Sequence, residues 1–261
     1  MYTAIIGDNH DKYMIARDCD DRTLDYRCPE CGSKMILKKG AIKTPHFAHK
    51  DNFLDCAFGK NESESHLKTK DFLYQLFKNN GDKVYAEYKV KDKDSNRYIF
   101  ADIYVVPKGT DMPVAIEILT KNLTVNDIKS RIDFYSRNNI AVLWLHDSSF
   151  YDRMKKNSEF KVSEPAKYLY RYYYNILYVF TGNGIMACKI SNAIHRTTGG
   201  YDSYGDYHEP SEYTCKTIYT LGSYDDKVDI TKDFSRNRKE KYGNLPEGYI
   251  YRLKYDKAKR L

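Results

Sequence analysis

Apolar and polar residues follow two different periods in the first half of the chain. Between Asn61 and Asn79 apolar residues recur at helical spacing, and the Asn-Asn-Gly sequence at 79–81 ends the run, which predicts a helix. Stretches rich in β-branched and aromatic residues follow at 84–90, 98–106 and 114–119. They predict three strands, and the turn-rich segment before the last one indicates a hairpin.

A second helix and a further strand complete this pattern. Val125, Ile128, Ile132 and Tyr135 are spaced as on one helix face, and residues 140–145 are apolar throughout. Such a fully apolar strand is typical of a sheet that is covered on both faces. Antiparallel strands, a crossover helix and a buried strand together predict an α/β fold with a mixed sheet and flanking helices.

The last third, residues 151–261, has a weaker pattern and many tyrosines. Residues 168–174 and 176–190 favour strands around a Gly-Asn-Gly turn, so we expect a Tyr-rich α+β region of uncertain fold. Residues 234–261 contain nine basic and three acidic side chains, an excess that accounts for most of the net charge of +7. This basic tail favours a polyanionic partner such as nucleic acid, or it is a solubilising segment.

Two further features concern the cellular environment. No apolar run approaches the length of about 18 residues that a membrane span requires, so we expect no membrane interaction. The first residues lack the basic segment of a secretion signal. We therefore expect a soluble, cytoplasmic protein whose cysteines stay reduced.

Five candidate metal ligands lie within the first 60 residues. Cys28 and Cys31 form a Cys-x-x-Cys-Gly sequence, His46 and His49 follow it, and Cys56 comes last. Structural zinc takes four such ligands, so one of the last three stays outside the site. If residues 46–48 are extended, Phe47 enters the small core and His46 turns the opposite way, which favours Cys28, Cys31, His49 and Cys56. We predict a small zinc-binding domain over residues 1–60.

Acidic residues occupy unusual positions in the next segment. Asp102 and Glu117 lie in the two strands of the predicted hairpin, and in-register pairing would place them side by side. A divalent metal ion relieves the repulsion of such a pair, and it can activate water against a phosphodiester. One face of the first predicted helix carries Glu62, His66 and Lys70, each four residues after the last. This spacing fits either a ladder of charged side chains on the surface or one wall of a functional site.

The order of these motifs resembles that of the competence protein CoiA-like family. The resemblance covers residues 26–146, and no single motif would suffice. It rests on Cys-Pro-x-Cys-Gly, Pro-His-Phe-Ala-His, a following Cys, Asn-Glu-Ser-x-x-His-x-x-x-Lys, Ala-Asp-Ile, Ala-Ile-Glu-Ile, Arg131 with Tyr135, and Val-Leu-Trp-Leu.

The resemblance implies a zinc-binding N-terminal domain and, over residues 61–150, a restriction-endonuclease-like PD-(D/E)xK nuclease domain associated with DNA uptake in bacterial transformation. Asp102 and Glu117 are then the ligands of Mg²⁺ or Mn²⁺, and Glu62, His66 and Lys70 form a wall of the active site. The implied partners are DNA and competence or recombination proteins.

One position departs from the family pattern. The strand usually continues from Glu to Gln or Lys two residues later, but here Leu119 follows Glu117, and the next lysine is Lys121. Lys121 can serve as the catalytic lysine if its long side chain reaches back. Otherwise the domain is a catalytically impaired module that binds DNA or acts as an adaptor.

Overall fold

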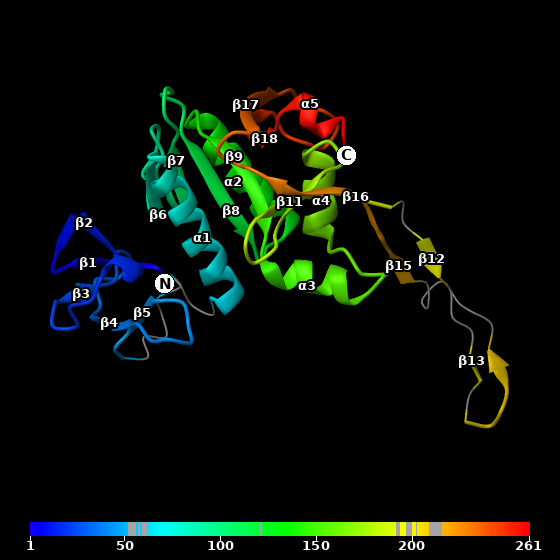
Figure 1. Cartoon of the computed structure of the whole chain (residues 1–261), viewed down its shortest axis with the longest axis horizontal. Coiled ribbons are helices and arrows are strands. Elements are labelled where there is room, and N and C mark those ends of the chain that lie inside the picture. Colours follow the sequence, from blue (N-terminus) through cyan, green and yellow to red (C-terminus); the bar gives the residue numbers. More distant parts are fainter. Residues whose placement is uncertain are drawn as a thin grey trace.

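The fold is described from a computed structural model of the chain. It describes residues 1–51, 56, 58, 62–120, 122–191, 194–196, 200–201, 203–208 and 216–261. Figure 1 shows a small N-terminal domain beside one end of a larger α/β body, and a narrow arm that carries β13 at the other end.

The N-terminal domain consists of short strands around a small core. The order β2-β1-β3 forms one sheet, with β1 at Thr3–Ile6, β2 at Asn9–Ile15 and β3 at Tyr26–Arg27. A one-turn helix at Ala16–Asp18 follows β2, and β4 (Met35–Lys38) pairs with β5 (His46–His49). Tyr26 and Phe47 pack their rings 4.8 Å apart in this core, and Cys28 and Cys56 are buried with them.

The larger body is one mixed sheet with helices against it. Its strands follow the order β16-β11-β10-β9-β8-β7-β6, and β18, which pairs with β17, also pairs with β9. The pairs β8–β9, β9–β10 and β9–β18 are parallel and the others are antiparallel. In chain order the elements are α1 (Glu64–Asn80), β6 (Lys83–Lys91), β7 (Tyr98–Val106), β8 (Val114–Leu119), α2 (Val125–Arg137), β9 (Ala141–His146), α3 (Ser148–Lys156), α4 (Glu164–Tyr172), β10 (Leu177–Phe180), β11 (Ile185–Ile190), β16 (Leu221–Val228), β17 (Phe234–Lys239), β18 (Gly248–Leu253) and α5 (Tyr255–Ala258).

The projecting arm consists of two short strand pairs. They are β12 (Ile194–Arg196) with β15 (Lys216–Ile218), and β13 (Gly200–Tyr201) with β14 (Tyr207–His208).

Local sequence explains the elements that position the site. The Ser63 side chain accepts a hydrogen bond from the His66 backbone and begins α1, and Gly81, with a φ of 75°, ends it in the left-handed conformation that glycine adopts without strain. Every residue of β8 and of β9 is buried, in agreement with their apolar sequences. The predicted fold class is confirmed: a mixed sheet with flanking helices follows a small domain that carries a Cys/His cluster.

The last third of the chain extends the same sheet and shares its core. The strand predicted at 168–174 is wrong, because α4 occupies Glu164–Tyr172. Ser163 caps this helix, and a buried face formed by Ala166, Leu169 and Tyr172 outweighs the strand propensity of tyrosine. The strands expected in 176–190 are confirmed as β10 and β11.

The basic tail is folded rather than extended. Its charged residues lie on the β17–β18 hairpin and around α5, and Arg236 donates a hydrogen bond to the Met112 carbonyl. Among the described helices, none has both the length and the apolar character needed to cross a membrane.

Candidate active site

The Cys/His cluster brings four candidate metal ligands together in the N-terminal domain. Ligand atoms of Cys28, Cys31, His49 and Cys56 all lie within 4.8 Å of one another. The sulfurs of Cys28 and Cys56 are 3.8 Å apart, and the Cys31 sulfur is 3.4 Å from Nε2 of His49. A tetrahedral zinc ion with bonds of about 2.3 Å to sulfur separates its ligands by about 3.8 Å, so the cluster fits zinc.

His46 is not part of this cluster. Its Nδ1 lies 2.9 Å from the Thr44 carbonyl oxygen, at the start of β5. Of the five candidate ligands, the structure therefore groups the four that strand alternation favours.

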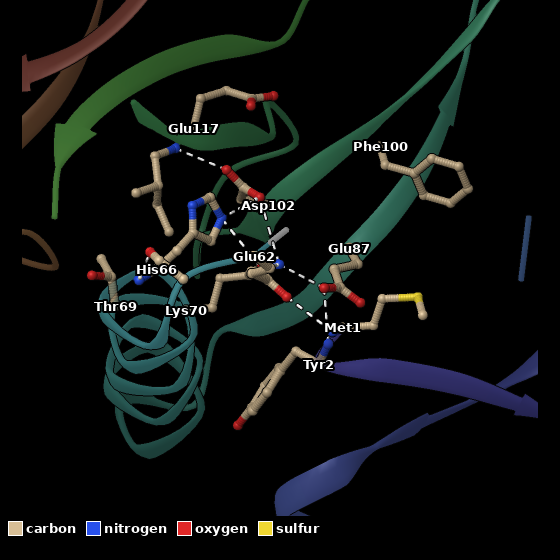
Figure 2. A network of polar contacts seen from close by, with 12 residues as sticks. Met1, Tyr2, Glu62, His66, Thr69, Lys70, Glu87, Phe100, Asp102 and Glu117 are labelled. Atoms are coloured by element: carbon tan, nitrogen blue, oxygen red, sulfur yellow. Dashed lines mark hydrogen bonds and ion pairs between the residues drawn. The ribbon is translucent and has the colours of Figure 1, made fainter. Parts of the chain in front are cut away.

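Figure 2 shows three polar residues at the N-terminal end of α1 around Asp102 of β7. His66 Nε2 lies 3.0 Å from Oδ1 of Asp102 and 3.5 Å from Oε1 of Glu62. The Lys70 ammonium contacts Glu62 and lies 3.7 Å from the same Asp102 oxygen. His66 and Lys70 of α1, with Glu62 just before the helix, thus form one wall of a charged site rather than an exposed ladder.

Ionised groups stabilise one another in this wall. Burial acts to raise the pKa of Asp102, but His66 and Lys70 hold it well below its ordinary value. Burial acts to lower the pKa of His66, yet the Asp102 and Glu62 carboxylates raise it above 6.5. The other Asp102 oxygen accepts a hydrogen bond of 2.9 Å from the Ile118 backbone, which ties β7 to β8. The site therefore holds a fixed carboxylate beside an imidazole and an ammonium.

Glu87 of β6 is a further member of the site. It is 3% exposed, and Lys70 donates a hydrogen bond of 2.5 Å to its Oε1. The backbone amides of Tyr2 and Thr3 in the N-terminal domain donate to the same carboxylate, at 2.8 and 2.9 Å. Glu87 is not among the residues that the sequence motifs indicate; its one sequence signal is an acid within the apolar and aromatic stretch at 84–90.

Glu117 of β8 faces a different set of groups. Arg131 of α2 donates to both of its oxygens, at 2.9 and 3.0 Å, and the Tyr135 hydroxyl donates to one of them. Figure 2 shows its side chain turned away from Asp102 and Lys70. Burial and the nearby Asp102 raise the pKa of Glu117 to about 7, although Arg131 and Tyr135 act to lower it. The described β7–β8 pairs end at Ile103 and Ile116, one residue short of Asp102 and Glu117. In this conformation the Glu117 carboxylate binds Arg131 and Tyr135, while that of Asp102 contacts His66.

A cavity of about 1450 Å³ runs along these residues. It extends from Cys31 in the N-terminal domain past Asp102 to Arg153 of α3. Leu119 and Arg131 also line it, so the residue that departs from the family pattern is part of its wall. Lys121 lies outside the described residues.

Family models match the chain in the same order as these structural parts. The model described as the N-terminal domain of competence protein CoiA matches residues 9–59, and the model of the CoiA nuclease-like domain matches residues 62–201. The latter range is more than half of the chain, and the chain therefore belongs to the competence protein CoiA family. It combines a small N-terminal domain that carries a Cys/His cluster with a nuclease-like domain.

A particular relative is the competence protein CoiA of Bacillus subtilis (strain 168). The chain is 26% identical to it over 132 residues, which are 50% of this chain and 33% of that protein. The chain thus matches about a third of the length of this relative. The family predicted from the motif order is confirmed.

Proposed function

We propose that the protein is a metal-dependent nuclease that hydrolyses phosphodiester bonds of DNA, in the cytoplasm, as part of competence. The observation that carries this proposal is the partly buried Asp102, which contacts His66 and lies near Lys70 at the wall of a large cavity in a nuclease-like domain. Competence or recombination proteins are the proposed partners.

The donor set fits a hard divalent cation. Asp102 and Glu62 offer carboxylate oxygens, which Mg²⁺ and Mn²⁺ prefer over nitrogen and sulfur. Glu117 would join them only if its carboxylate left Arg131. When bound, the ion would polarise the scissile phosphate and lower the pKa of a water molecule. The N-terminal cluster would hold structural zinc, which needs no open ligand position.

The chain's own residues supply the remaining chemistry. Lys70 places a positive charge 3.7 Å from Asp102, where it can stabilise the negative charge that develops on a phosphate. Arg131, Arg153 and Lys161 line the same cavity and would bind phosphates next to the scissile one. His66, hydrogen-bonded to Asp102, would hold or donate a proton. Lys121 remains a second candidate for the catalytic lysine.

One observation favours a different function. Leu119 lines the cavity where the family usually has Gln or Lys, and a leucine cannot orient water. Together with the contact between Glu117 and Arg131, this would suit a module that binds DNA without cutting it.

A nuclease assay separates the two functions. Purified protein is incubated with labelled single-stranded or double-stranded DNA and either Mg²⁺ or Mn²⁺. The proposal expects cleavage that EDTA stops. A gel shift without cleavage under every metal would support the DNA-binding module instead. In that case the Leu119→Gln and Leu119→Lys variants test whether a polar group at this position restores cleavage.

A further inference from the structure

Lys70 carries its charge in a place that is almost fully buried. Its side chain is 4% exposed, and the carboxylates of Glu62, Glu87 and Asp102 surround its ammonium. A buried ammonium is costly unless it is paired and hydrogen-bonded, so the position of Lys70 depends on these carboxylates. Glu62 and Asp102 are both candidates for contact with metal or substrate. Glu87 differs from them because groups of the N-terminal domain also hold its carboxylate in place.

The Glu87 carboxylate is fully occupied by donors. Oε1 accepts from the Tyr2 amide and from Lys70, while Oε2 accepts from the amide and the hydroxyl of Thr3, at 2.9 and 2.7 Å. A carboxylate in this arrangement has no free oxygen lone pairs directed at a cavity, and a metal ion would have to displace several hydrogen bonds. Glu87 is therefore suited to fix a neighbouring group rather than to hold an ion.

The backbone of β6 is adapted to this contact. Glu87 has a φ of 48°, in a region that a strand residue with a side chain rarely adopts. The register pairs Ala86 with Ile103 and Tyr88 with Ala101, so Glu87 stands opposite Asp102 without a ladder pair. Two facing carboxylates repel each other, and the Lys70 ammonium lies close to both. Strain of this kind is kept where the surrounding contacts enforce it.

We infer that Glu87 is a positioning residue for Lys70, and that the first strand of the N-terminal domain completes the nuclease site by holding Glu87. Met1 and Tyr2 lie below Glu87 in Figure 2. The inference deepens the proposed function, because it explains how a lysine on a helix is fixed for the chemistry of Asp102. It also gives the N-terminal domain a direct part in the site.

Glu64 provides a matched control. Its carboxylate accepts hydrogen bonds from the amide and the hydroxyl of Thr44, at 3.0 and 2.8 Å, so it also connects α1 to the N-terminal domain. It differs from Glu87 because Lys70 is not among its contacts. Glu64→Gln therefore weakens only the contact between the N-terminal domain and the nuclease-like domain. Glu87→Gln weakens that contact and also removes the charge beside Lys70.

The first readout does not depend on activity. In the zinc-loaded, ¹⁵N-labelled full chain, the buried Lys70 ammonium should give a side-chain NMR signal that exchanges slowly with water and is absent in Lys70→Arg. We expect Glu87→Gln to shift this signal and to accelerate its exchange by about tenfold or more, while Glu64→Gln leaves both unchanged. An unchanged Lys70 signal in folded Glu87→Gln would overturn the inference.

The second readout is cleavage. Glu87→Gln should lower kcat by about tenfold to a hundredfold with little change in KM, whereas Glu64→Gln should behave as the parent. A parallel loss in both variants would assign Glu87 to attachment alone and overturn the inference. If the parent cleaves no DNA, the proposed nuclease fails, and the NMR comparison alone decides whether Glu87 positions Lys70.

A milder variant covers the case in which Glu87→Gln does not fold. Thr3→Val removes only the hydroxyl donor to Glu87 and keeps the backbone amide. A changed Lys70 signal in Thr3→Val supports the inference, and an unchanged one contradicts it.

Discussion

Buried charges form the candidate site at the scale of single residues. Lys70 lies within ion-pair distance of three carboxylates, and burial opposes the charge on Lys70, Glu87 and Asp102. Their mutual attraction outweighs that cost: Glu87, Glu62 and Asp102 raise the pKa of Lys70 above its ordinary value. In turn, Lys70 holds the pKa of Glu87 below its ordinary value, and His66 and Lys70 do the same for Asp102. The charges are therefore stable only as a group.

Removal of Lys70 alone should destabilise the fold. Lys70→Met leaves the Glu87 carboxylate buried without its ammonium partner, and we expect a loss of about 3–5 kcal/mol in the free energy of unfolding. Adding Glu87→Gln removes one uncompensated charge and should recover part of this loss. Urea unfolding of the two variants measures both values. A double variant that is less stable than Lys70→Met would contradict this description of the group.

His146 should make stability depend on pH. It is 4% exposed, and within the described residues its Nε2 has no hydrogen-bond partner. Burial lowers the pKa of His146 to about 4 from 6.5, so the unfolded chain binds the extra proton first. The contribution of neutral His146 to the free energy of unfolding is fully present above about pH 6.5. It falls by about 3 kcal/mol as the pH decreases towards about 4. In His146→Gln this part of the pH dependence should be absent. Urea unfolding at a series of pH values measures it. If the free energy of unfolding depends on pH equally in both proteins, another group titrates.

Some residues of the candidate site can be predicted from the sequence, and others cannot. The wall formed by Glu62, His66 and Lys70 follows from helical spacing and from the family resemblance. Glu87 could not be found in this way, because its partners Tyr2 and Thr3 lie more than 80 residues away and contact it through their backbone amides and the Thr3 hydroxyl. The direction of the Glu117 side chain depends on Arg131 and Tyr135, whose roles the pattern of the strand does not reveal.

At the scale of elements, caps determine where the helices of the site begin. Thr124 and Asp127 form a reciprocal capping box at the start of α2, the helix that presents Arg131. Thr124→Ala should lower the free energy of unfolding by about 1 kcal/mol, since an amide at the helix start loses its acceptor. Asn126→Ala, at an exposed position in the same turn, serves as the control. Equal thermal stability of the two variants would show that the capping box does not stabilise α2.

Elements with a strong apolar period were predicted well, and the tyrosine-rich ones were not. β7 and β8 match the predicted strands at both ends, because their apolar runs are bounded by turn residues. The segment at 168–174 was misassigned, since tyrosine packs equally well on a buried helix face and the Ser163 cap was overlooked. The sheet contributed by β17 and β18 depends on a parallel contact with β9 that no local pattern shows.

At the scale of the whole molecule, the Cys/His cluster is connected to the candidate active site through β1. Cys28 follows β3, which pairs with β1, and the Phe47 amide in the strand of His49 donates a hydrogen bond of 2.8 Å to the Met1 carbonyl. Zinc should therefore support both the small core and the contact of β1 with Glu87.

Metal analysis of the purified protein should give about one zinc ion per chain. Cys28→Ser should lose it and lower the thermal stability of the N-terminal domain, because this domain has only a small core of its own. Cys19→Ser, at a buried cysteine outside the cluster, is the control for loss of a thiol. A zinc-free parent that is fully folded would contradict the assignment of the cluster.

The most direct test of the central claim compares DNA cleavage by the parent and by Asp102→Asn. This change keeps the shape of the side chain and removes the negative charge that would bind the metal ion and that raises the pKa of His66. The account predicts Mg²⁺- or Mn²⁺-dependent cleavage by the parent and a loss of at least about a hundredfold in Asp102→Asn, with both proteins folded. Equal cleavage by folded Asp102→Asn and parent would contradict the assignment of the site.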